Sequence, residues 1–378
     1  MWFARRVRAR SEPPPAWLSL LLLIGVTAVV TQLGRARGAA TGAFGTTRST
    51  DEPHLVQEGR AMQPGRGRNA TSPWQIPWRG WKDVFWRVYE EIGNDRLLAV
   101  AAGVVFYGLL ALFPAITALV SLYGLFAKGA TLSEHLALMS DLMPGGAFGI
   151  VQEQVTRIVQ KGDAKLGFTF LFGLGLALWS ANAGMKAIMD ALNVVYDETE
   201  KRSFIKLNLV SLAFTLSAIA ALLVAIGTVV VFPIAMSFIG LGTWGEILIR
   251  VLRWPSLFVI VLFGLALLYR FGPSRTRARW QWLTVGSLFA AAAWLAGSGL
   301  LSWYLANFAD YDATYGSLGA AIGLMMWMWL SATVILVGAE LNSEIEHQTA
   351  IDSTTGMAKP LGARGAVVAD TVGPAKAA

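Results

Sequence analysis

Long apolar stretches alternate with short charged segments through most of this chain, and these stretches set the expected fold. Each approaches or exceeds the roughly 20 residues that a helix needs to cross a bilayer, and most are too long for strands. We therefore predict an all-α, polytopic membrane helical bundle over residues 81–347, with six core transmembrane helices. The six expected spans are Leu97–Ala127, Leu166–Met185, Leu207–Phe232, Trp254–Tyr269, Trp280–Ala309 and Ala313–Ala339.

Two amphipathic regions accompany these spans and predict interfacial helices. Apolar residues recur at helical spacing from Trp81 to Ile92, with Lys82 and Arg87 on the opposite side, which is typical of a helix lying on the cytoplasmic interface. The segment Thr131–Asp163 contains two more apolar helical faces, split by Pro144. We expect this segment on the outer side of the membrane, where a lid and a structural cap are both open alternatives.

The two ends of the chain differ from the expected bundle in composition. Residues 1–16 are basic, and Trp17–Leu33 is an apolar run that suits an extra span or a signal-like segment. A chain start near Met62 is a third alternative. Residues 34–80 are rich in Gly, Arg, Thr and Pro without periodicity and predict a disordered linker, and residues 348–378 predict a disordered cytoplasmic tail.

The placement of cations predicts an orientation. Four arginines crowd the turn after Tyr269, whereas the turn holding Asp310 and Asp312 has no cation. Lys and Arg stay on the cytoplasmic side, so both ends of the core are expected inside and Asp310 outside. These membrane-proximal cations also explain the formal net charge of +7 without a nucleic-acid partner. The expected partner is the lipid bilayer, and a homo-oligomer is an open alternative.

Several motifs stand in the same order as in a known family. The segment from Trp81 to His347 resembles the YihY/BrkB family of bacterial inner-membrane proteins. The resemblance implies a multi-pass protein of the bacterial cytoplasmic membrane, but little chemistry, because the family is described as a virulence factor and, through an old label, as ribonuclease BN-like. The motifs are the run Ala101–Leu125, LYRFGPS (Leu268–Ser274), TYGSLGA (Thr314–Ala320), Trp327, Trp329 and GAEL (Gly338–Leu341).

Polar and helix-breaking residues in the spans are the candidates for a transport path. Pro114, in the same span as Tyr107, favours a kink, and a broken helix can expose backbone groups to a substrate. A kink that only serves packing is the alternative. Asn182, Lys186 and Asp190 follow at spacings of four on one helical face. That face suits a substrate or ion path if it points into the bundle; otherwise Lys186 lies at the membrane boundary and the rest is solvated.

The last span ends in a second candidate. Glu340 is a carboxylate near a helix C-terminus, where the helix dipole disfavours it, so we expect compensation from the arginine turn on the same side. A proton or cation site and a structural tie between helices are both open. Gly316, Gly319 and Gly323 are expected to allow close helix packing, since two of them form a GxxxG pattern.

The residue types of common catalytic sites are sparse. The chain has no Cys, and its three His residues, His54, His135 and His347, share no metal-ligand spacing. We find no phosphate-binding loop or nucleophile elbow and therefore predict no enzyme, no metal and no cofactor. The leading hypothesis is a transporter of a solute, ion or lipid. The alternatives are a non-transporting scaffold or envelope-integrity protein and, less favoured, a membrane-embedded hydrolase or ribonuclease.

Overall fold

A computed structural model describes residues 54–124, 168–226, 242–308 and 317–376. Within these ranges the protein is all-α, with nine α-helices and one short 3-10 helix. The expected lid segment Thr131–Asp163, the apolar run Trp17–Leu33 and the acidic turn at Asp310 lie outside the described residues.

The helices are long in the segments where the sequence predicts spans. Their bounds are α2 (His54–Ala61), η1 (Pro73–Gln75), α3 (Trp78–Asn94), α4 (Leu97–Gly124), α7 (Phe168–Val195), α8 (Phe204–Ile226), α10 (Gly242–Phe271), α11 (Trp280–Phe308), α13 (Ser317–His347) and α14 (Val367–Asp370).

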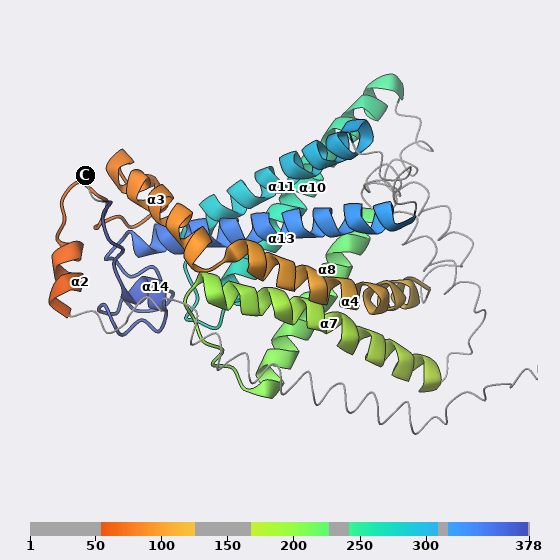
Figure 1. Cartoon of the computed structure of the whole chain (residues 1–378), viewed down its shortest axis with the longest axis horizontal. Coiled ribbons are helices and arrows are strands. Elements are labelled where there is room, and N and C mark those ends of the chain that lie inside the picture. Colours follow the sequence, from red (N-terminus) through yellow and green to blue (C-terminus); the bar gives the residue numbers. More distant parts are fainter. Residues whose placement is uncertain (1–53, 125–167, 227–241, 309–316, 377–378) are drawn as a thin grey trace, which may run out of the picture. The chain divides into compact units, whose positions relative to one another are not determined.

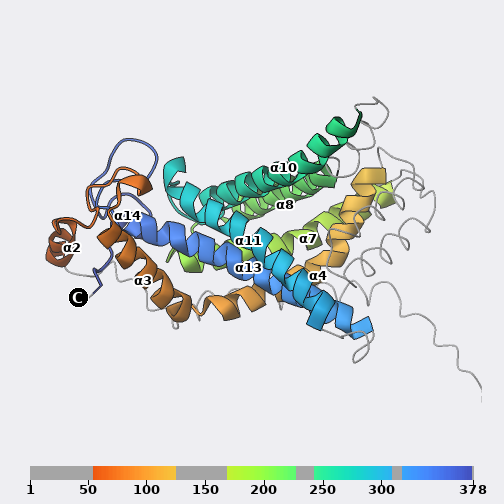
Figure 2. The same cartoon turned by 90° about the horizontal axis from the view of Figure 1, so that it is seen from above.

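Helix α13 lies at the centre of the arrangement (Figures 1 and 2). It contacts α3, α4, α7, α11 and α14, while the outer neighbours pack in chain order from α4 to α7, α8, α10 and α11. Its residues Ala332, Leu336 and Ala339 are buried in the main hydrophobic core, together with Leu97 of α4 and Leu192 of α7. A helix that is apolar on nearly every side is expected to have neighbours on several sides, and α13 contacts five other helices.

Three described helices are long and apolar enough to cross a membrane: Phe204–Val224, Trp280–Leu305 and Ala321–His347. A fourth span is added if α3 and the start of α4, which meet at a bend of 58°, are counted as one. The predicted all-α architecture with several membrane-type helices is confirmed, while the number six stays a prediction.

Helix α3 turns a different side inward from the one that its apolar periodicity predicts. Val84 and Val88 are buried as expected, but Asp83 and Arg87 are buried with them, whereas Tyr89 is 72% exposed. The reason is that α3 packs against the polar end of α13, where buried charged partners are present. The helix is therefore a packed element of the bundle end as well as an amphipathic one.

The segment before α3 is ordered from His54 onward, in contrast to the disordered linker that its composition predicts. Ala70 and Ile76 share a small core with Val84 and Ile345. The buried Arg68 donates hydrogen bonds to the carbonyl groups of Gln348 (3.1 Å) and Gly373 (2.7 Å). Burial and the neighbouring Arg87 lower the pKa of Arg68 to about 10. Long-range hydrogen bonds of this kind leave no periodic pattern in the sequence.

The residues after α13 are also ordered as far as residue 376, so the expected disordered tail differs from the structure there. Arg364 is buried and donates to the carbonyl groups of Ala350 (2.6 Å) and Ala369 (2.5 Å). The backbone N–H of Arg279 donates to Ser353, and that of Val367 donates to the Glu198 carboxylate. The tail is therefore held at one end of the bundle mainly by hydrogen bonds to backbone groups in several turns, and not by an amphipathic helix with one apolar face.

Candidate functional site

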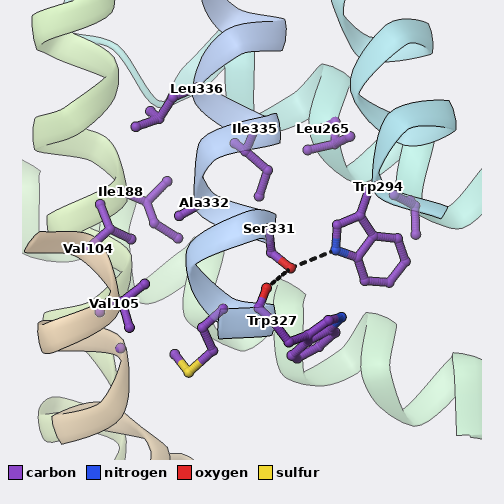
Figure 3. Close-up of a pocket in the computed structure, with 14 residues that line it drawn as sticks. Val104, Val105, Ile188, Leu265, Trp294, Trp327, Ser331, Ala332, Ile335 and Leu336 are labelled. Carbon is purple, nitrogen blue, oxygen red and sulfur yellow. Dashed lines mark hydrogen bonds between the residues drawn. The ribbon is translucent and has the colours of Figure 1, made fainter. Parts of the chain in front are cut away.

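Residues of five helices line a partly open cavity of about 440 Å³, shown in Figure 3. Its volume falls within the roughly 300–1,000 Å³ that is typical of small-molecule sites. Helix α13 supplies the most side chains, and α4, α7, α10 and α11 complete the wall. The lining residues are Val104, Val105, Gly108, Gly184, Ile188, Val261, Leu265, Trp294, Trp327, Met328, Ser331, Ala332, Ile335 and Leu336.

The few polar groups in the wall bind one another. The indole N–H of Trp294 donates to the Ser331 hydroxyl over 2.9 Å, and that hydroxyl donates to the carbonyl of Trp327 over 2.7 Å (Figure 3). The indole N–H of Trp327 donates to Ser298 over 3.1 Å. Because these groups are satisfied within the protein, the cavity offers its contents mainly aliphatic and aromatic surface. This surface suits an apolar chain better than an ion, whose charge would lose its hydration without compensation.

The predicted polar face of α7 points toward α8 rather than into the cavity. Asn182 is 1% exposed and accepts a hydrogen bond of 3.1 Å from the Thr215 hydroxyl of α8. Lys186 donates to the side-chain oxygen of Asn208 over 2.5 Å, also on α8. Asp190 is exposed. The arrangement ties α7 to α8, and none of these three side chains lines the cavity.

The candidates in α4, Tyr107 and Pro114, are not part of the cavity wall. Tyr107 is partly buried and precedes the lining residue Gly108. Gly108 and Gly184 bring α4 and α7 close together, since a Cβ at Gly184 would lie 3.6 Å from the Gly108 Cα. Pro114 lies inside α4, which is helical from Leu97 to Gly124. The expectation that Pro114 exposes backbone groups to a substrate stays a prediction.

Glu340 is fully buried where α13 leaves the apolar part of the bundle. It lies near Tyr196, whose pKa is raised by burial first, then by Glu346, with a further contribution from Glu340. The arginine turn does meet the acidic end of α13, as the sequence predicts. However, its Arg275 pairs over 2.6 Å with Glu346, which lies nearly two helical turns beyond the predicted partner Glu340.

A second buried ion pair at this end was not predicted. Arg87 of α3 pairs with Glu344 of α13, and its guanidinium also donates to the side chain of Gln348 over 2.8 Å and to the carbonyl of Pro374 over 2.9 Å. His347 lies 3.7 Å from the Glu344 carboxylate and 3.1 Å from the Thr371 hydroxyl. Within the described ranges, no group of three or more His, Asp or Glu side chains is placed to hold a metal ion. These residues, Arg87, Glu344, His347 and Gln348 with their contacts in the tail, connect α3, α13 and the tail by charged groups and are called the charged joint below.

The tightest described contact of α11 with α13 is at two other glycines, and the packing role of Gly316, Gly319 and Gly323 stays a prediction. Gly316 lies outside the described residues, Gly319 is buried, and a Cβ at Gly323 would meet Leu305 of α11 at an ordinary 3.6 Å. The tight approach is at Gly286 and Gly338, where an added Cβ would overlap the facing helix. Gly338 belongs to the GAEL motif, but its packing role cannot be read from spacing alone.

Long apolar helices that line a largely apolar cavity, and that are joined at one end of the bundle by buried ion pairs, define a helical membrane-protein bundle. The chain belongs to the virulence factor BrkB family, whose model matches residues 88–361. This match includes the cavity, the α13 residues of the charged joint and the first part of the ordered tail, and it begins one residue after Arg87.

Relatives with curated descriptions agree with this class. The chain is 32% identical over 271 residues to a protein of Bacillus subtilis strain 168 described as a putative ribonuclease-like protein YfkH, covering 69% of this chain and 93% of that one. It is 29% identical over 265 residues to a UPF0761 membrane protein of Alkalilimnicola ehrlichii, covering 68% of this chain and 57% of that protein. A UPF0761 membrane protein of Glaesserella parasuis is 28% identical over 226 residues, which cover 59% of this chain and 77% of that protein. No solved structure matches the chain.

Proposed function

We propose that this protein moves an amphipathic lipid molecule across the bacterial cytoplasmic membrane by way of the five-helix cavity, without catalysing a chemical reaction. The observation that carries the proposal is the apolar lining, whose polar groups are already hydrogen-bonded to one another. Among a solute, an ion and a lipid, the lipid has the chemistry that such a wall favours, because its acyl chain needs no hydrogen-bonding partner.

The positions of the helix ends support six crossings. The start of α8 and the end of α10 are joined by the hydrogen bond from the Lys201 N–H to Ser274, and the end of α10 meets the end of α13 through Arg275 and Glu346. Arg87 of α3, the helix that precedes α4, pairs with Glu344 at that same end. If each of the six long helices crosses once, the chain returns to this end after every second crossing. We propose that this charged end is cytoplasmic, in accord with the positive-inside rule.

A non-transporting scaffold is the second candidate, and the polar contacts favour it. Asn182 and Lys186 bind α8 residues, and Glu340 is buried near Tyr196 rather than in the cavity wall. In a scaffold the cavity would be a fixed space between helices. The two functions differ in one observable property, since only a transporter changes the leaflet of its substrate.

The test is lipid redistribution in proteoliposomes containing a fluorescent phospholipid that dithionite bleaches only in the outer leaflet. The wild-type protein is expected to raise the bleached fraction above the roughly half seen in protein-free vesicles. Ala332→Phe, which fills the cavity from α13, is expected to abolish this increase. The matched control is Ala183→Phe, at an exposed position of α7, which is expected to behave as the wild type.

Two outcomes would count against the proposal. If the bleached fraction in vesicles with the wild-type protein equals that in protein-free vesicles, the protein does not translocate lipid and the scaffold function is favoured. Equal redistribution by the wild type and both variants would show that lipid crosses by another route. Reconstitution of each variant is checked by its elution as a monodisperse species and by its helical circular dichroism.

A further inference from the structure

We propose that Arg270 and Arg277, at the junction of α10 and α11, bind the anionic phosphate headgroup of a membrane lipid. This inference is independent of translocation, because a lipid can be held at the edge of the bundle whether or not another lipid moves through its centre.

The two guanidinium groups stack on neighbouring aromatic rings, those of Phe271 and Trp280. The Arg270 guanidinium carbon lies 4.3 Å from the centroid of the Trp280 ring and 5.6 Å from that of Phe271, and Arg277 lies 4.8 Å from the same Phe271 ring. The Phe271 and Trp280 rings meet at 73° with centroids 6.5 Å apart. Stacking occupies the flat face of a guanidinium, so the N–H donors on its edge gain no hydrogen bond from these rings.

The donors of Arg270 have no acceptor among the described residues. Its Nε and Nη1 atoms are shielded from solvent and make no hydrogen bond within that part of the chain. Buried donors of this kind normally have a partner. Arg270 and Arg277 also lie near enough to repel each other. An anion between them would satisfy the donors and remove the repulsion.

The neighbouring cations differ in this respect. Arg275 pairs with Glu346 at 2.6 Å, Arg202 pairs with Glu200 at 2.7 Å, and Lys201 pairs with Glu198 at 2.7 Å. No carboxylate in the described ranges forms an ion pair with Arg270 or Arg277. Those other cations therefore already have an anionic partner within the protein, whereas Arg270 and Arg277 are suited to bind an anion from outside the protein.

The position selects a lipid as the source of the phosphate. Arg270 lies in the last turn of α10, and Trp280 begins α11, a helix long and apolar enough to cross a membrane. Trp280 is 45% exposed, and amphipathic aromatic side chains favour the headgroup level of a bilayer. Arg270 is about 140° around the helix from the cavity residue Leu265, at 100° per residue, so the site is separate from the cavity.

The experiment is a native mass-spectrometry titration of the full chain in detergent with phosphatidylglycerol or with phosphatidylcholine of the same acyl chains. Phosphatidylglycerol is expected to bind more tightly, and Arg270→Gln and Arg277→Gln are each expected to weaken it about tenfold. Arg79→Gln on α3, which removes an exposed cation from another surface, is expected to leave this affinity unchanged. Because Arg277 is itself exposed, its substitution tests the site without endangering the fold.

Three results would overturn the proposal. The first is equal affinity for the two lipids. The second is an equal loss in all three variants, which would indicate attraction to net charge alone. The third is competition by inorganic phosphate at the concentration of bound lipid, which would identify a free anion as the ligand. Loss of redistribution with retained lipid binding would instead concern only the translocation proposal.

Discussion

Replacing Gly286 with Ala should destabilise the bundle strongly, because this residue marks the closest approach of α11 to α13. The added methyl would overlap the carbonyl oxygen of Gly338 and lie 2.5 Å from the Asn342 Cγ, against 3.4 Å or more in ordinary contact. The Gly286 N–H also donates to Asn342 over 2.8 Å. Overpacking costs about 1–3 kcal/mol, and loss of the buried hydrogen bond adds about 1 kcal/mol. We therefore expect a loss of about 2–4 kcal/mol.

A glycine on the same helix provides the control. A Cβ at Gly299 would meet nothing within 4 Å, so Gly299→Ala should be neutral or stabilise the helix by up to about 1 kcal/mol. The measurement is reversible unfolding in mixed micelles, driven by SDS and followed by far-ultraviolet circular dichroism. Equal midpoints for the two alanine variants would refute the close approach at Gly286.

The other predictions concern the charged joint, the tail and the α7–α8 contact. Arg87→Gln leaves the buried Glu344 carboxylate without its cation and should cost about 3–5 kcal/mol of unfolding free energy, part of which is recovered when Glu344→Gln is added; equal costs for the single and double variants would contradict the pairing. Burial alone would raise the pKa of Asp352, but hydrogen bonds from the Thr354 side chain and from backbone N–H groups outweigh it and hold the pKa below its usual 3.8. Asp352 therefore contributes stability that is fully present above about pH 4 and is lost as pH falls through the lowered pKa, and Asp352→Asn should reduce this acid sensitivity in an unfolding titration. Thr215→Val leaves the buried Asn182 oxygen without its donor and should cost about 1–3 kcal/mol in SDS unfolding, whereas an unchanged midpoint would show that the hydrogen bond is dispensable.

The sequence predicted most helices well, because apolar stretches of this length have few alternative structures. It did not predict how the helices continue beyond the spans. The last span was predicted to end at Ala339, and helix α13 continues past it to His347, where Glu344 and Glu346 are buried against Arg87 and Arg275. Hydropathy cannot distinguish such a buried polar turn from a solvated one.

The candidate site was harder to predict than the fold. Polar residues within an apolar sequence, such as Lys186, were the natural candidates for a transport path, yet Lys186 contacts α8 and does not line the cavity. The cavity is lined by residues such as Ile188 and Ala332, whose types are the same as those of any packing residue. Only the arrangement of five helices distinguishes them. Trp327, and Val104, Val105 and Gly108 in the run Ala101–Leu125, are lining residues that the sequence had singled out, but only as parts of family motifs.

The most direct test of the central claim is to locate lipid within the protein. Proteoliposomes would contain a phospholipid with a photoactivatable group in its acyl chain, and adducts would be mapped by mass spectrometry after illumination. Our account predicts adducts on cavity residues, with Met328 and Ile188 the clearest, and their loss in Ala332→Phe. Adducts confined to outward-facing residues such as Leu110 and Leu222, with the cavity unmodified in the wild type, would contradict it.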